Sequence, residues 1–370
     1  MEALQARESH TLARYAMHSV DTAGRKHPER SHSYRGPFQR DRDRIVHSAA
    51  YRRLSYKTQV FTGELGDYHR SRLTHTLEAT SIARTLGRAL RLNEDLIEAL
   101  AIVHDIGHPP FGHAGEDTLN DCLRQHGGFS HNEQALRIVE LLENRYPEFP
   151  GLNLSIEVLE GQAARVQKGA SSQQPLLETQ VVDAADSVAY DTHDADDAME
   201  LELLSLEELL EVPLWREAAV RVQTRYTALT PAQLRRAVLH ELIDWQVGDL
   251  LRQASAGIAA NQVDSTIAVR SAPPLVRASP ELAELKRELE RFLFDRVYRH
   301  PQVLRMRVQA QGFLRTMYEG FVRRPDLLPE VAQQRIEATG LERTIGDYLA
   351  GMTDRFAQRE HERRFADARV

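Results

Sequence analysis

The sequence predicts an all-α protein, and three observations support that fold class. Apolar residues recur at helical spacing between charged residues over residues 40–60, 71–92 and 177–190. Helix-start signals punctuate the second half, where Ser205 and Glu208 form a capping box, and Thr230-Pro231 and Ser279-Pro280 each place a capping residue before a first-turn proline. The chain contains no internal repeat, no Gly-rich phosphate loop and no nucleophile elbow. We therefore expect a helical core with additional C-terminal helices.

The first third of the chain divides into helices separated by turn signals. Residues 40–60 are typical of an amphipathic helix followed by a turn, and residues 62–67 mark a loop. A second helix is expected over residues 71–92. Asn93 then caps a third helix, whose apolar run ends at His104-Asp105, just before a pair of prolines. This ending places polar side chains together at the C-terminus of a buried helix.

The middle of the chain alternates helices with connections. Residues 133–143 and 155–160 are expected to be helical, and residues 177–190 form the next amphipathic pattern. Residues 161–174 are rich in Gly, Ala, Ser and Gln and have almost no large apolar residue, which predicts a mobile loop. Residues 259–278 contain a proline pair and β-branched residues, so we expect an extended connection or a short strand.

Composition limits the classes of protein and of site. The chain is 42% hydrophobic and 27% charged, as is typical of globular proteins. No stretch approaches the roughly 18 uncharged residues of a membrane span, so we expect a cytoplasmic protein with no membrane partner. The single cysteine, Cys122, excludes a Cys-based zinc site, so any metal must be held by His and carboxylates. A net charge of −7 does not support single-stranded DNA as a partner.

A local excess of positive charge lies near the N-terminus. Residues 1–53 hold eleven Lys or Arg against six Asp or Glu. Such a segment is often a solvated surface, but it can also offset the charge of a polyanion such as a triphosphate. Arg52, Arg53 and Lys57 are the candidates for phosphate contacts, and ordinary surface ion pairs are the alternative for each.

Imidazoles and carboxylates cluster in residues 101–116, which read AIVHDIGHPPFGHAGE. A divalent cation needs ligands from several elements, and His75, His104-Asp105 and Asp186 lie on three separate predicted helices. From spacing alone, a single histidine such as His75 on an apolar helix is more often a core residue than a ligand, and other aspartates compete with Asp186. The His-Asp dipeptide is not diagnostic, since it recurs at His193-Asp194 in a segment without other histidines.

The remaining polar residues of the cluster suit proton transfer. His108, His113 and Glu116 can act as general acid, general base or relay when their pKa values lie near neutrality. The alternative is that they only hydrogen-bond the metal ligands.

Five segments in order resemble the deoxyguanosinetriphosphate triphosphohydrolase-like branch of the HD-domain superfamily, together with FLFDRVYRHPQVLRMR (292–307) in the C-terminal part. The five are RGPFQRDRDRIVHSAAYRRLSYKTQVF (35–61), RSRLTHTLEA (70–79), HDIGHPPFGHAGE (104–116), FSHNEQALRI (129–138) and VVDAADSVAYDTHDADDAM (181–199). The resemblance covers most of residues 35–325.

The resemblance implies metal-dependent hydrolysis of a deoxynucleoside triphosphate (dNTP) to deoxynucleoside and inorganic triphosphate, by attack of a metal-activated water on the α-phosphorus. The metal would be Mg²⁺, Mn²⁺ or a different transition metal. Matching residues give the metal ligands His75, His104, Asp105 and Asp186, the catalytic relay His113 and Glu116, and the further catalytic histidines His108 and His131. Matching substrate contacts are Arg72 at the phosphates, Tyr190 and Asp194 around the sugar, and Gln59 near the 3′-hydroxyl.

The sequence departs from the family pattern at one position and leaves several features open. Some relatives carry a lysine directly after the last metal ligand, where this chain has Ser187, so that phosphate contact must be absent or made by another residue. The preferred dNTP and an activating second dNTP are not specified. The alternatives to a dNTP triphosphohydrolase are an HD-family 5′-deoxynucleotidase or phosphodiesterase, and a nucleotide or single-stranded DNA sensor without turnover.

The motifs also suggest a division of the chain. We expect an N-terminal segment at residues 1–34, an HD-domain catalytic core at residues 35–200, and a helical C-terminal region at residues 201–370. The C-terminal region would pack on the core and support a homo-oligomer.

Overall fold

The structure, a computed structural model, describes residues 2–59, 70–167 and 173–365. Within these ranges the regular structure is helical, and strand pairing is limited to three isolated bridges. The predicted all-α fold is therefore confirmed. No helix in the described part of the chain has the length and apolar character needed to cross a membrane. The loop predicted at residues 62–67 lies outside the described residues.

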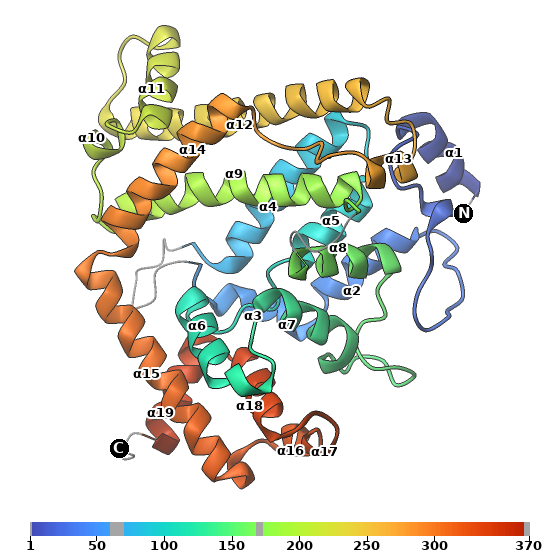
Figure 1. Ribbon diagram of the computed structural model, residues 1–370, viewed down its shortest axis with the longest axis vertical. Coiled ribbons are helices and arrows are strands. Elements are labelled where there is room, and N and C mark those ends of the chain that lie inside the picture. The colour runs from blue at the N-terminus through green and yellow to red at the C-terminus, as the bar shows by residue number, and fades with distance from the viewer. Residues whose placement is uncertain (1, 60–69, 168–172, 366–370) are drawn as a thin grey trace.

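The N-terminal half packs around α4, with α5 and α9 against it (Figure 1). Its helices are α1 (Glu2–Thr11), α2 (Pro37–Val46), α3 (Ala49–Arg53), α4 (Arg72–Ala89), α5 (Glu94–Val103), α6 (Gly112–Cys122), α7 (His131–Arg137), α8 (Ile156–Val166) and α9 (Leu177–Glu200). Apolar residues of α2, α4, α5 and α9 form one continuous core, to which part of α12 (Pro231–Ala260) and α13 (Thr266–Ser271) also contribute.

Two predicted helix starts explain how this core is built. The Asn93 side chain accepts a hydrogen bond from the Leu96 N–H and caps α5, as predicted. Ser71 caps α4 in the same way through the Thr74 N–H. The helix predicted over residues 40–60 is interrupted, because Ser48 has extended backbone and caps the separate helix α3.

Three further boundaries differ from prediction. The loop predicted at residues 161–174 is helical up to Val166, because Gly161 and Gln162 are buried against the core. Residues 168–172 of that loop lie outside the described residues. The connection predicted at residues 259–278 contains α13, capped by Ser265, and no strand is described in it. Helix α9 continues ten residues past the predicted end at Tyr190, to Glu200.

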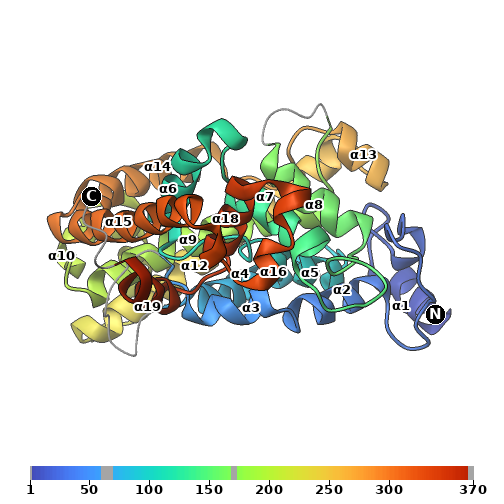
Figure 2. The ribbon, with the colours of Figure 1, turned by 90° about the horizontal axis from the view of Figure 1, so that it is seen from below.

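The C-terminal half forms two further cores. Its remaining helices are α10 (Leu206–Leu209), α11 (Pro213–Arg225), α14 (Pro280–Leu293), α15 (Pro301–Arg323), α16 (Glu330–Gln333), α17 (Ile336–Thr339), α18 (Leu341–Ala350) and α19 (Asp354–Phe365). The predicted caps of α10, α12 and α14 are confirmed. One core joins the end of α9 to α11, α12 and α14, and the other joins α6 to α15, α18 and α19 (Figures 1 and 2). The expected boundary at residues 200/201 stays a prediction.

Candidate active site and metal centre

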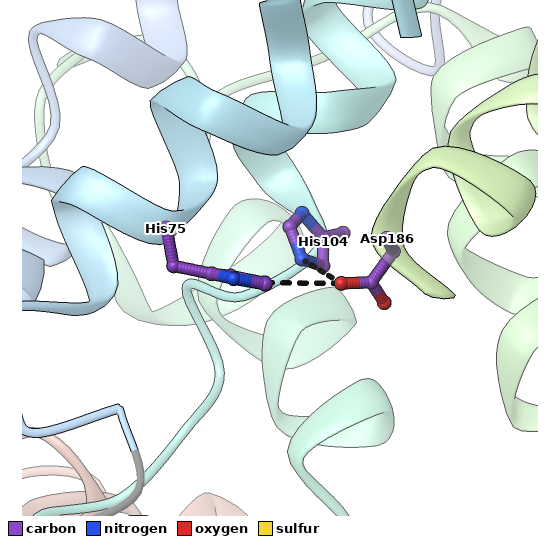
Figure 3. A group of neighbouring side chains, drawn as sticks. All are labelled: His75, His104 and Asp186. Atoms are coloured by element: carbon purple, nitrogen blue, oxygen red, sulfur yellow. Dashed lines mark hydrogen bonds and ion pairs between the residues drawn. The ribbon is translucent and has the colours of Figure 1, made fainter. Parts of the chain in front are cut away.

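Three helices bring a metal-capable group together. His75 on α4, His104 directly after α5 and Asp186 on α9 place one potential ligand atom each within 4.8 Å of the others. The His75 Nε2 atom lies 3.0 Å from Asp186 Oδ1, and His104 Nε2 lies 3.4 Å from the same oxygen. Both imidazoles point toward this carboxylate in Figure 3. The fold thus unites three ligands predicted from separate elements.

The donor atoms fit a divalent cation. The Nδ1 atom of His104 contacts the Ala101 carbonyl oxygen, which favours a proton on Nδ1 and a free lone pair on Nε2. That Nε2 atom is buried and, apart from its 3.4 Å contacts with the Asp105 and Asp186 carboxylates, has no hydrogen-bond partner among the described residues. Burying an imidazole nitrogen that faces a carboxylate costs free energy unless a proton or a metal ion lies between them. His75, His104 and Asp186 can therefore hold a metal ion with nitrogen and oxygen donors.

Charges at this group are coupled. Burial alone would raise the pKa of Asp186, but His104 and His75 outweigh it and hold that pKa well below its usual range. Burial alone would lower the pKa of His104, and the carboxylates of Asp105 and Asp186 instead raise it. The two carboxylates thus favour a positive charge at their centre, which a proton on His104 or a metal ion can supply.

Asp105, the fourth predicted ligand, lies beside this group and makes other contacts as well. Its Oδ1 atom lies 3.4 Å from His104 Nε2 and 3.1 Å from His108 Nδ1. Its Oδ2 atom accepts a hydrogen bond of 3.1 Å from Arg72 Nη1. The Asp105 carboxylate therefore joins the metal-capable group to His108, and its assignment as a ligand stays a prediction.

A second polar group contains the residues predicted for proton transfer. The His131 ring stacks on the His108 ring with centroids 3.9 Å apart, and His131 Nδ1 lies 2.8 Å from Glu116 Oε1. His113 Nδ1 lies 3.5 Å from Glu116 Oε2, and its side chain is 63% exposed. Glu116 is thus the shared partner of His113 and His131.

The stacked geometry favours proton transfer over metal binding, although His108, Glu116 and His131 lie close enough for an ion. An imidazole binds a metal in the plane of its ring, and an ion midway between two nearly parallel rings would lie outside both planes. Burial alone would raise the pKa of Glu116, but its hydrogen bonds with His113 and His131 lower that pKa far below the usual range. Glu116 is therefore an anion that orients the histidines.

A glycine makes the stack sterically feasible. Gly107 lies in the turn after α5, and a Cβ atom there would lie 1.9 Å from the His131 carbonyl oxygen and 2.4 Å from the Ala135 nitrogen. Both atoms belong to the backbone of α7, so they cannot rotate away. The absence of a side chain at Gly107 lets α7 approach the turn, which brings His131 onto His108.

The sugar-contact candidates follow Asp186 along one face of α9. Asp186, Tyr190 and Asp194 are spaced by four residues, so their side chains leave the same side of the helix. The Tyr190 hydroxyl lies 2.7 Å from the Tyr298 hydroxyl, and Tyr298 donates a hydrogen bond to Asp194. Burial raises the pKa of Asp194 to about 6, although this hydrogen bond opposes the rise.

Not every predicted substrate contact faces the metal-capable group. Arg72 is buried and holds Asp105 and the Gln59 carbonyl oxygen, which accepts from Arg72 Nη2 at 3.1 Å. The Lys57 ammonium donates to the carbonyl oxygens of His108 and Ala350. Arg53 lines a separate cavity of about 500 Å³ between α7, α16 and α18.

Three residues near the site escaped sequence reasoning. Arg165 lies 3.8 Å from Asp186 and 2.7 Å from Asp183, because α8 continues through the predicted loop. The His193 ring packs edge-on against the His75 ring, with centroids 5.8 Å apart. The segment around His193 has no other histidine, so only the fold brings His193 next to a predicted metal ligand. Tyr298 lies within residues 292–307, and the family resemblance of that segment is the sequence signal that could have identified it.

Comparison with known proteins assigns both halves of the chain. Residues 72–191 match the HD domain family, and residues 276–363 match the phosphohydrolase-associated domain. A protein of Thiobacillus denitrificans is 44% identical over 96% of this chain and 98% of the relative. One of Geobacter sulfurreducens is 44% identical over 98% and 97%, and one of Bordetella pertussis is 46% identical over 96% and 96%. All three are named deoxyguanosinetriphosphate triphosphohydrolase-like proteins. This chain therefore belongs to the deoxyguanosinetriphosphate triphosphohydrolase-like family and is an HD-domain hydrolase that depends on a metal.

Proposed function

We propose that this protein hydrolyses a dNTP at the α-phosphorus, releasing deoxynucleoside and inorganic triphosphate. The observation that carries the proposal is the pairing of two groups. A metal-capable set of His75, His104 and Asp186 lies beside a proton-transfer set centred on Glu116, and Asp105 with His108 joins them. Hydrolysis of a charged phosphate ester needs both charge compensation and proton transfer. The names of the relatives supply the substrate class.

His75, His104 and Asp186, with Asp105 beside them, would hold the cation. When bound, a divalent ion lowers the pKa of water and offsets negative charge on phosphate oxygens. Arg72 fixes the orientation of Asp105 through a contact of 3.1 Å and is itself a fixed positive charge behind that carboxylate. We propose that Arg72 also lowers the electrostatic cost of bringing phosphate oxygens to the site.

Cleavage between the α-phosphorus and O5′ requires a proton on the leaving 5′ oxygen. We propose that His113 gives this proton, because its side chain is exposed and its Nδ1 atom faces Glu116. Glu116 would stabilise the charged form of His113, while His131 and His108 contact the phosphate. The stack of His108 on His131 keeps both rings in fixed orientations.

The face of α9 beyond Asp186 would contact the sugar. Tyr190, Asp194 and Tyr298 form one chain of hydroxyl and carboxyl groups along this face. Such hydroxyl and carboxyl groups can donate hydrogen bonds to a deoxyribose hydroxyl and accept hydrogen bonds from it. Gln59 is a further candidate, since its Oε1 atom is buried without a partner among the residues that the structure describes.

Product analysis tests the proposal. The purified protein is incubated with each dNTP singly and with all four together, in Mn²⁺ or Mg²⁺, and the products are resolved by anion exchange. We expect inorganic triphosphate and deoxynucleoside in equal amounts. Orthophosphate would instead indicate a 5′-deoxynucleotidase or phosphodiesterase, and binding without any product would indicate a sensor. Triphosphate formed only in the mixture would show that a second dNTP activates the enzyme.

A further inference from the structure

Helix α6, which carries His113 and Glu116, begins in an unusual way. Its N-cap residue, Phe111, has left-handed backbone with φ of +64° and makes no side-chain cap. Bulky residues rarely adopt this conformation, and the first N–H groups of a helix need acceptors from elsewhere. The Phe111 N–H instead donates a hydrogen bond of 3.0 Å to Asp354 Oδ1. Asp354 is the first residue of α19, so the acceptor comes from the C-terminal region.

The second oxygen of Asp354 holds another part of the core. Asp354 Oδ2 accepts hydrogen bonds from the Thr58 N–H, at 3.0 Å, and from the Thr58 hydroxyl. Thr58 in turn forms a backbone bridge with Ser71, the cap of α4. One carboxylate therefore ties the start of the helix that carries His75 to the start of the helix that carries Glu116.

Lys57 makes a parallel link. Its side chain is buried, and its ammonium donates to the His108 carbonyl oxygen at 2.5 Å and to the Ala350 carbonyl oxygen at 2.9 Å. Ala350 ends α18, four residues before Asp354. The segment from Ala350 to Asp354 thus holds the turn from His108 to Phe111 at both of its ends.

We propose that Asp354 and Lys57 are positioning residues, through which the C-terminal region fixes the turn from His108 to Phe111 and the start of α6. This inference rests on the proposed function, since it assigns His108, His113 and Glu116 to the reaction. Asp354 carries the larger share because its carboxylate accepts from the N–H of Phe111, the N-cap residue of α6, at the end of the helix where the dipole favours a negative charge. The C-terminal region would then be part of the active site without contacting substrate.

Substitution tests this role in the full-length, metal-loaded enzyme. Asp354→Ala removes the carboxylate that accepts hydrogen bonds from Phe111 and Thr58, so the turn should shift. A shift of about 1 Å in catalytic groups can cost about a hundredfold in rate. We therefore expect kcat for triphosphate release to fall by about ten- to a hundredfold, with KM and bound metal nearly unchanged. Lys57→Met keeps the apolar stem and should act in the same direction. Asp354→Asn keeps an acceptor for Phe111 but meets Thr58 with an amide, so its kcat should be intermediate.

The matched control is Glu330→Ala. Glu330 is an exposed first-turn carboxylate of α16, in the same C-terminal region, and its substitution should leave kcat unchanged. A folded Asp354→Ala protein with wild-type kcat would overturn the proposal. If Asp354→Ala does not fold, wild-type kcat in both Asp354→Asn and Lys57→Met would overturn it instead. If the wild-type protein releases no triphosphate, the proposed function fails, and the position of His108 and Glu116 in a crystal structure of Asp354→Asn decides the positioning role alone.

Discussion

At the scale of single residues, the site is a set of ionisable groups, most of them buried, that compensate one another. Asp105 is shared by Arg72, His104 and His108, and Glu116 is shared by His113 and His131. Each carboxylate therefore keeps a pKa below its usual range despite burial. Removing one partner leaves the charge of the others unbalanced, so substitution of a single residue should have a measurable effect.

Glu116→Gln tests the proton-transfer group. The amide keeps the shape of the side chain but cannot stabilise positive charge on His113 or His131, so kcat should fall by about 10²- to 10⁴-fold. Metal content should not change, because Glu116 lies outside the group of His75, His104 and Asp186, and the stacked rings of His108 and His131 do not suit a metal ion at its own group. The control is Asp117→Asn, which alters an exposed neighbour on α6 that pairs with Arg307. Equal rates in the two variants would exclude Glu116 from the reaction.

Asp194 gives a pH-dependent prediction. Its pKa in the folded protein is raised from 3.8 to about 6, chiefly by burial. The folded state binds the Asp194 proton more tightly than the unfolded state does, which stabilises the fold. This contribution is fully present below about pH 4 and is lost as pH rises through about 6. The free energy of unfolding of wild type relative to Asp194→Asn should thus rise, by on the order of 3 kcal/mol, as pH falls from 7 to 4. Urea unfolding at several pH values measures it, and parallel stability curves would contradict the shift.

At the scale of elements, the site depends on how closely α7 packs against the turn after α5. Gly107 permits that contact, and Phe111 and Gly112 then redirect the chain with positive φ values into α6. These three residues bring His108 in the turn close to His113 and Glu116 on α6.

Gly107→Ala tests this packing. The added methyl group would collide with the backbone of α7, so the protein should lose about 1–3 kcal/mol of stability and most of its activity. Gly312→Ala is the matched control, because nothing lies within 4 Å of a Cβ at this exposed position inside α15. That change should stabilise the protein by about 0.5–1 kcal/mol. Thermal unfolding measures the stability of both variants. Similar changes in stability at the two glycines would contradict the prediction.

Helix starts were predictable where the signal is local. The caps at Asn93, Ser205 and Thr230 act within three residues, so sequence alone identifies them. The continuation of α8 to Val166 was not predictable, because Gly161 and Gln162 are helical only through burial against distant residues. Tertiary packing there overrides a composition that is typical of a loop.

At the scale of the whole molecule, the metal-capable group exists only when α4, α5 and α9 are packed together. The clustered residues from His104 to Glu116 could be recognised in the sequence because they lie within thirteen positions. His75 and Asp186 were assigned through family resemblance, and Tyr298 and Arg165 reach the site through contacts that no local pattern encodes. Likewise, the link from Asp354 to Phe111 spans most of the chain.

Metal binding should therefore stabilise the folded protein. An ion that binds only the folded state adds about 2.7 kcal/mol at a concentration a hundredfold above its Kd. We expect Mn²⁺ to raise the Tm of protein freed of metal with a chelator, and His104→Gln to lose most of this rise. An equal rise in the variant would place the ion elsewhere on the molecule.

We expect triphosphate release to require a metal ion held by His75, His104 and Asp186, and paired substitutions on α9 test this requirement most directly. Asp186→Asn removes a metal-capable carboxylate, whereas Asp183→Asn removes a neighbouring carboxylate that also pairs with Arg165. Bound metal and triphosphate release are measured on both proteins. We expect Asp186→Asn to lose the metal and about a thousandfold in rate, about 4 kcal/mol, and Asp183→Asn to keep both the metal and the rate. Full metal content and wild-type triphosphate release in Asp186→Asn would contradict this expectation.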